Sequence, residues 1–98
     1  MTYRNRKLLN LARELPCMLG LPGCEGMACD PAHSNQSKHG KGMSMKADDC
    51  FWIASCRACH RELDQGKTMD RATKFDAWDR AFLKTVKALW ENNLIEVK

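Results

Sequence analysis

The chain has 98 residues, enough for one small hydrophobic core and too few for two ordinary domains. Its 16 Lys and Arg residues outnumber its 12 Asp and Glu residues, so the formal net charge is +4. No apolar run is long enough to span a bilayer. We therefore expect one domain over residues 1–98, with no membrane partner and with a modest attraction to polyanions.

Six cysteines in so short a chain are typical either of a disulfide scaffold or of a metal site. Residues 1–9 run into charged side chains instead of a long apolar segment, so they lack the pattern of a secretory signal. In a reducing compartment, paired cysteines usually bind metal. We therefore expect a cytoplasmic protein whose cysteines hold a metal ion, with the disulfide scaffold as the less favoured alternative.

The first predicted element is an amphipathic helix within residues 1–15. Its apolar residues recur at helical spacing, and Pro16 stops the pattern. Basic residues gather on the same segment, where they can steer a polyanion or simply face solvent. The apolar positions are Leu8, Leu11, Ala12 and Leu15, and the basic ones are Arg4, Arg6, Lys7 and Arg13.

Cys17 and Cys24 follow, separated by a segment whose Gly and Pro residues predict a tight turn. This spacing resembles a zinc knuckle with a widened loop, although six intervening residues exceed the usual two to four. Cys29 is a rival ligand that can replace Cys17. We expect Cys29 and Cys50 otherwise to be small buried residues.

A loose β-hairpin is expected next. Residues 27–33 predict a short strand weakened by Pro31, and residues 51–55 have the aromatic and β-branched content of a buried strand. Residues 34–46 between them are polar and contain glycine, which indicates an exposed, mobile loop in which His39 is incidental or touches phosphate. This loop carries Lys38, Lys41 and Lys46 with no acid among them.

The second strand leads into Cys56 and Cys59, a CxxC pair that can place two thiolates on one metal ion. A short helix should follow over residues 59–65 and end at Gly66. Asp70 can then cap a long helix over residues 70–93. Its predicted core stripe is Phe75, Trp78, Phe82, Val86 and Leu89, with Trp90 beside it.

If Cys17, Cys24, Cys56 and Cys59 share one tetrahedral zinc ion, that metal joins the ends of the hairpin to the helix that follows. His33 and His60 should then be drawn together. One neutral imidazole can take a proton from water, and another can hold a divalent cation against a phosphate. This pair predicts phosphodiester hydrolysis, while His60 as a fourth zinc ligand is the alternative.

The order of these motifs resembles the HNH, or ββα-metal (His-Me finger), endonucleases. It is more closely similar to the small phage and prophage nuclease-like family typified by YbcO. The matching stretches include Ala32–His33, Asp49, the run from Ile53 to His60, and residues 62–64. The resemblance implies an α+β fold: a zinc-stapled, treble-clef-like ββα core over residues 17–66 between the two flanking helices.

The resemblance also implies roles for individual residues. His33 takes the position of the general base, Asp49 lies near the position of the residue that orients it, and His60 matches a ligand of catalytic Mg²⁺ or Mn²⁺. The four cysteines would hold a structural Zn²⁺. Ala32 departs from the family, because many members have an additional metal ligand there; Asp30, Asp49 or Asp64 would have to assist His60.

The favoured function is therefore metal-dependent hydrolysis of DNA by an endonuclease, in phage DNA processing or recombination within a bacterial cell. Candidate DNA contacts are Lys38, Lys41, Lys46 and Arg57. A non-catalytic zinc-stapled module that binds nucleic acid or protein is the main alternative. A redox role for Cys56 and Cys59 is less favoured because no βαβ pattern surrounds them. The sequence carries no signal for the oligomeric state.

Overall fold

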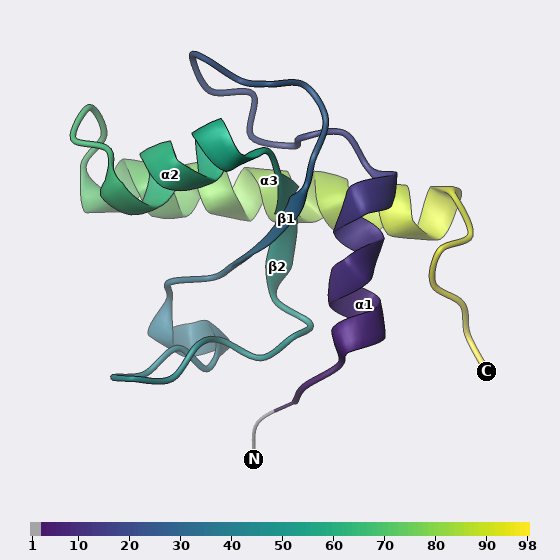
Figure 1. Cartoon of the computed structure of the whole chain (residues 1–98). Coiled ribbons are helices and arrows are strands. Elements are labelled where there is room, and N and C mark those ends of the chain that lie inside the picture. The colour runs from purple at the N-terminus through teal and green to yellow at the C-terminus, as the bar shows by residue number, and fades with distance from the viewer. Residues whose placement is uncertain (1–2) are drawn as a thin grey trace.

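The computed structural model describes residues 3–98, which form an α+β fold with a two-stranded antiparallel sheet and three α-helices (Figure 1). No helix of this part of the chain is both long and apolar enough to cross a membrane. In chain order, the elements are α1 (Arg6–Asn10), the 3₁₀ turn η1 (Leu11–Glu14), β1 (Asp30–His33), the 3₁₀ turn η2 (Ser37–His39), β2 (Trp52–Ser55), α2 (Arg57–Gln65) and α3 (Arg71–Glu91).

The N-terminal helix starts at Arg6 because Asn5 caps it. The Asn5 side chain accepts a hydrogen bond of 3.0 Å from the backbone N–H of Leu8, which would otherwise lack a partner. The helix tightens into η1 at Leu11, and the chain becomes extended at Leu15. The amphipathic helix predicted within residues 1–15 is thus one α-helical segment followed by a 3₁₀ turn.

β1 and β2 form the predicted hairpin and pair antiparallel. Asp30 lies opposite Ser55, Pro31 opposite Ala54, Ala32 opposite Ile53, and His33 opposite Trp52. Successive side chains of a strand point to opposite faces of a sheet. Asp30 and Ala32 therefore lie on one face, and Pro31 and His33 lie on the other. This alternation decides where the chemistry-bearing residues of β1 point.

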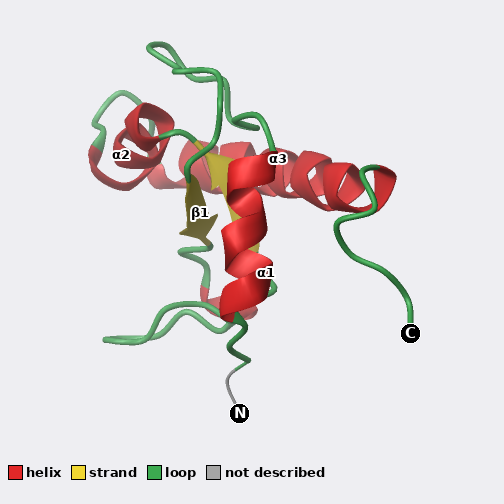
Figure 2. Ribbon diagram, turned by 45° about the vertical axis from the view of Figure 1, so that its right-hand side comes forward, coloured by secondary structure: helices red, strands yellow, loops and turns green. Residues whose placement is uncertain are grey.

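The hairpin lies among the three helices (Figures 1 and 2). Two apolar clusters pack against its two faces. The face that carries Trp52 and Ala54 packs against the N-terminal helix and the C-terminal half of α3. The other face packs against α2 and the N-terminal half of α3, and its buried members are Ala32, Ile53, Leu63, Trp78 and Ala81. The short sheet is thereby fixed from both sides.

Helix α3 begins where the sequence predicts, because the Asp70 side chain accepts a 2.8 Å hydrogen bond from the backbone N–H of Thr73. Its buried side is rotated relative to the predicted stripe and consists of Trp78, Ala81, Thr85 and Leu89. Phe75, Phe82 and Val86 are only half-buried, and Trp90 is exposed. Thr85 is buried because its hydroxyl donates to the Ala81 carbonyl and accepts from the Ala54 N–H.

The segment after β1 is anchored at its start, so the expectation of one exposed, mobile loop over residues 34–46 is wrong there. Ser34 and Gln36 are buried, and the Ser34 hydroxyl lies 2.6 Å from His39 Nδ1. The His39 ring stacks on Phe51 at 4.7 Å between ring centroids. His39 therefore takes part in an aromatic contact, whereas the sequence suggested that it was incidental or touched phosphate. Residues 42–46 form the longest uninterrupted exposed stretch of this segment.

Candidate metal centre and polar sites

Four cysteines from two separate segments meet at one point of the fold. One ligand atom from each of Cys17, Cys24, Cys56 and Cys59 lies within 4.8 Å of the other three. Four thiolates around a tetrahedral zinc ion, with Zn–S bonds of about 2.3 Å, would have sulfur atoms about 3.8 Å apart. The cluster is close to that arrangement, and none of the six cysteines is in a disulfide. The four cysteines can hold a metal ion such as zinc.

The widened loop between Cys17 and Cys24 folds because its backbone closes on itself and on α2. The Cys17 N–H donates to the Gly26 carbonyl, and the Cys24 N–H donates to the Leu21 carbonyl, both at 2.9 Å. Gly26 adopts φ 93°, a left-handed conformation that residues with a Cβ rarely adopt. The loop therefore presents both thiols to the CxxC pair despite its length.

Backbone N–H groups surround the cysteine cluster as they do around metal-bound thiolates. The Sγ atom of Cys56 accepts from the N–H groups of Glu25 at 3.3 Å and Cys59 at 3.4 Å. Burial raises the pKa of Cys17, but backbone hydrogen bonds from Gly20 and its neighbours outweigh that effect and lower it to about 6. Burial and the adjacent thiols raise the pKa of Cys59. The environment of Cys17 therefore favours its thiolate, and a bound cation would stabilise the thiolate of Cys59.

Cys29 and Cys50 lie outside the cluster, so the structure groups Cys17, and not Cys29, with the other three cysteines. Both are exposed, and the expectation that they are buried residues is wrong. Cys29 precedes β1 directly, and its N–H donates to the Ser55 carbonyl at 3.1 Å. Its neighbour Ala28 is buried, whereas Cys29 itself is exposed.

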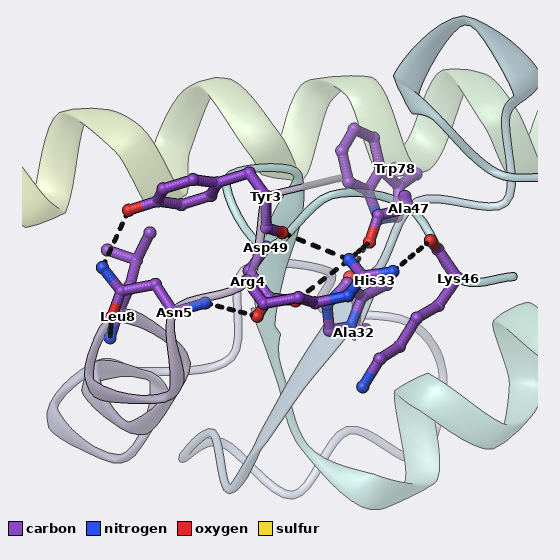
Figure 3. Close-up of polar contacts among 10 residues, drawn as sticks. All are labelled: Tyr3, Arg4, Asn5, Leu8, Ala32, His33, Lys46, Ala47, Asp49 and Trp78. Atoms are coloured by element: carbon purple, nitrogen blue, oxygen red, sulfur yellow. Dashed lines mark hydrogen bonds and ion pairs between the residues drawn. The ribbon is translucent and has the colours of Figure 1, made fainter. Parts of the chain in front are cut away.

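A histidine–carboxylate pair lies at the end of β1 (Figure 3). His33 Nε2 is 2.8 Å from Asp49 Oδ1, and the Asp49 side chain is only 4% exposed. Burial raises the pKa of Asp49, but hydrogen bonds from His33 and from the Asn5 N–H outweigh it, so the pKa lies below its ordinary value. An ionised carboxylate only accepts hydrogen bonds, so His33 donates through Nε2. Its Nδ1 is then the basic nitrogen of the neutral ring.

The N-terminal segment, not only the loop, positions Asp49. The Asn5 N–H donates to Asp49 Oδ2 at 2.7 Å, and the Asp49 N–H donates to the Tyr3 carbonyl at 2.9 Å. The guanidinium group of Arg4 donates to the carbonyls of Ala47 and Lys46 and lies 3.6 Å from Asp49 Oδ1 (Figure 3). Tyr3, Arg4 and Asn5 thereby fix the carboxylate that orients His33.

A solvent-open hollow of about 420 Å³ lies beside this pair and is lined by Asp49, Pro31 and the start of α1. Three cationic side chains line it as well: Arg4, Arg6 and Lys46. Two of them belong to the basic N-terminal cluster, and the third belongs to the loop. The hollow is therefore chemically suited to a phosphate group near His33.

A second polar centre surrounds His60 on α2. Its Nδ1 is 3.3 Å from Asp30 Oδ2, and its Nε2 is 3.2 Å from Asp64 Oδ2. The contact with Asp64, one helical turn further on, and the contact with Asp30 raise the pKa of His60 although burial opposes them. These residues line a hollow of about 260 Å³ with Arg57 and Arg61. Carboxylates and imidazole are ligands that Mg²⁺ and Mn²⁺ can bind.

His33 and His60 are not brought into contact. Among residues 3–98 no hydrogen bond or ion pair joins them, and the only group of three or more ligands that meet at one point is the cysteine cluster. Asp30, the partner of His60, lies on the opposite face of β1 from His33 and about 10 Å away along the strand. The two centres are therefore separated by the hairpin.

The candidate DNA contacts are divided in the same way. Lys46 belongs to the hollow beside His33, and Arg57 belongs to the hollow at His60, where its Nε is 3.8 Å from Asp30 Oδ1. Lys38 lies 3.9 Å from Asp79 of α3, and the Lys41 amine donates to the Gly42 carbonyl. Sequence reasoning missed Arg61, Asn5 and Asn10 as lining residues, because no local pattern marks them.

Comparisons with models of protein families, with curated proteins and with solved structures found no match to this chain.

Proposed function

We propose that the chain is a metal-dependent endonuclease that hydrolyses phosphodiester bonds in DNA and has a ββα-metal core stapled by zinc. The observation that carries the proposal is the pair formed by His33 and Asp49. A buried, ionised carboxylate holds a half-buried imidazole through Nε2, beside a hollow lined by three cations. This combination serves to activate water next to a phosphate.

In this proposal, His33 Nδ1 takes the proton from the attacking water. Asp49 fixes the tautomer and stabilises the imidazolium that forms, and Arg4, Arg6 and Lys46 attract the DNA backbone. The resemblance implies an asparagine near this position, so Asp49 departs from the family by replacing an amide with a carboxylate. A carboxylate orients the base as an amide would, and it adds a charge that favours the protonated product.

His60 would hold the catalytic cation together with either Asp30 or Asp64. Asp30 lies at Nδ1 of the His60 ring and Asp64 lies at Nε2. A cation bound at one of these nitrogens would replace the proton that the nitrogen shares with its carboxylate. When bound, Mg²⁺ or Mn²⁺ supplies positive charge to a leaving oxygen. Either carboxylate would supply a ligand that Ala32 lacks, and Arg57 and Arg61 line the same hollow.

We assign a structural role to a zinc ion held by the four cysteines of the cluster. Small domains of this length have little stability to spare, and a structural zinc site contributes about 10–16 kcal/mol of apparent binding energy. Metal at this point would connect the loop before β1 to the start of α2. It would thereby fix His60, which follows Cys59 directly. The family resemblance further supports a role in phage DNA processing or recombination.

The test is cleavage of supercoiled plasmid DNA by the zinc-loaded protein with added Mg²⁺ or Mn²⁺. The His33→Ala and His60→Ala variants should lose cleavage and still bind DNA, because the cationic side chains remain. Lys87→Ala is a control, since Lys87 is exposed on α3 and, within residues 3–98, forms an ion pair only with Glu91. Wild-type cleavage by His33→Ala would refute the assignment of the base.

A non-catalytic zinc-stapled module that binds DNA is the second candidate. The separation of His33 and His60 by the hairpin favours it, since one scissile phosphate must otherwise engage residues from both faces. This candidate predicts salt-dependent DNA binding without cleavage under either cation, and binding that does not change in the His33→Ala variant.

A further inference from the structure

An aromatic hollow of about 330 Å³ lies between α2, the start of α3 and the segment after β1. Its volume is at the lower end of the range for small-molecule sites, roughly 300–1,000 Å³. Leu63 and Trp78 are its buried apolar residues, and Phe75 is half-buried at its side. The Trp78 indole donates to the Ala32 carbonyl at 3.1 Å, which fixes that ring in place.

The charged and polar groups of the hollow match a nucleotide. The Arg71 guanidinium carbon lies 5.2 Å from the centroid of the Phe75 ring, and Lys74 lines the same hollow. The Lys74 amine also donates to the Gly66 carbonyl at 2.6 Å, so the start of α3 holds it near the hollow. The Arg71 guanidinium lies over one face of the Phe75 ring, so a base would stack on the other face or on the guanidinium plane, and the two cations offer contacts for a neighbouring phosphate.

Two amide side chains complete the lining. The Asn35 amide donates to Asp64 at 3.0 Å, and the Gln36 amide donates to Asp79 at 2.7 Å. With their N–H groups used in this way, both amides are oriented, and their carbonyl oxygens remain acceptors for the amino or imino groups of a base. The carboxylate of Asp64 also faces His60, which offsets its charge.

Asp64 lines both this hollow and the one at His60, so the two hollows adjoin. We propose that the aromatic hollow binds an unpaired nucleobase of DNA, so that the preferred substrate carries a single-stranded nucleotide next to the cation site at His60. The substrate preference rests on the proposed endonuclease function, whereas binding of the base does not require cleavage. A paired base cannot enter the hollow without leaving its stack.

The experiment measures binding of fluorescently labelled oligonucleotides, one single-stranded and one a duplex of the same sequence, without added divalent cations. Phe75→Leu removes the aromatic face and keeps an apolar side chain, and Arg71→Gln removes the cation. Each has a control on the same helix. Leu83→Ala is the first, since Leu83 is 71% exposed, and Arg80→Gln is the second, since Asp76 is the one ion-pair partner of Arg80 in the described part of the chain. Circular dichroism and thermal unfolding confirm that each variant is folded.

Phe75→Leu should weaken binding of the single strand by about 5- to 150-fold, the range set by stacking of one base on an aromatic ring. Duplex binding should not change, and the controls should bind both oligonucleotides as the wild type does. Unchanged single-strand binding in both Phe75→Leu and Arg71→Gln would overturn the proposal, and so would an equal loss for single strand and duplex.

A cleavage assay with the same proteins separates this inference from the proposed function. If the wild type cleaves neither DNA but Phe75→Leu selectively loses the single strand, the nuclease assignment fails and the base-binding site stands. If Phe75→Leu cleaves plasmid and single-stranded DNA with the wild-type ratio of rates, the base-binding site fails and the nuclease assignment stands.

Discussion

Asp49→Asn isolates the charge that orients His33 while keeping the size of the side chain. The carboxylate accepts hydrogen bonds from His33 Nε2 at 2.8 Å and from the Asn5 N–H at 2.7 Å. A hydrogen bond to a charged acceptor contributes about 1 kcal/mol more than one to a neutral acceptor. Because the side chain is 4% exposed, solvent screens little of this difference. The variant should lose about 2 kcal/mol of unfolding free energy at pH 7.

The pH dependence provides the sharper measurement. The pKa of Asp49 is lowered in the folded chain, so its stabilising effect is present above the unfolded value of about 3.9 and is lost as pH falls through the folded value. Urea unfolding of both proteins, with saturating zinc, should show a stability gap that is present between pH 7 and about 5 and closes below about 4. Both proteins lose metal alike as the thiolates are protonated, so the gap itself is the quantity compared.

Asp76→Asn is the matched control for this change. Asp76 forms an exposed ion pair with Arg80, and its loss should alter stability by less than about 0.5 kcal/mol. The proposed role of the Asp49 carboxylate would be refuted if Asp49→Asn were as stable as the control. It would also be refuted if the stability gap between wild type and Asp49→Asn persisted unchanged at acid pH.

Three further predictions concern the framework of the site. Thr85→Val should cost about 1–3 kcal/mol, because the buried Ala54 N–H loses its acceptor, and chemical denaturation measures the loss. Leu63→Ala should cost about 2–5 kcal/mol in the same assay, since Leu63 is buried between the sheet and α3. Removal of metal by a strong chelator should abolish the cooperative thermal transition, and an unchanged melting temperature would contradict the proposed role of the cysteines.

Local patterns predicted the elements that depend on neighbouring residues. The CxxC spacing of Cys56 and Cys59 places two thiols on one side of a helix start, and Asp70 caps α3 as its sequence context indicates. Cys17 and Cys24 were predictable because glycine and proline close the loop between them. The hairpin followed from two apolar segments flanking a polar one, and the structure confirms its antiparallel pairing.

Contacts between distant segments could not be read from the sequence. Asn5 and Asp49 are 44 positions apart, and nothing in either segment indicates that the N-terminal residues hold the partner of His33. The role of His39 depends on stacking against Phe51 across the hairpin. The separation of His33 from His60 depends on strand register, because a shift of one residue would exchange the two faces of β1.

Hydrolysis of DNA with a divalent cation is the activity proposed for this chain. The most direct measurement incubates the zinc-loaded wild-type protein with supercoiled plasmid, alone and with added Mg²⁺ or Mn²⁺, and quantifies the nicked product. The proposed endonuclease should nick the plasmid only when the cation is added, and the amount of nicked product should increase with the amount of protein. Intact plasmid under both cations, at protein concentrations that saturate DNA binding, would contradict it and leave a zinc-stapled binding module.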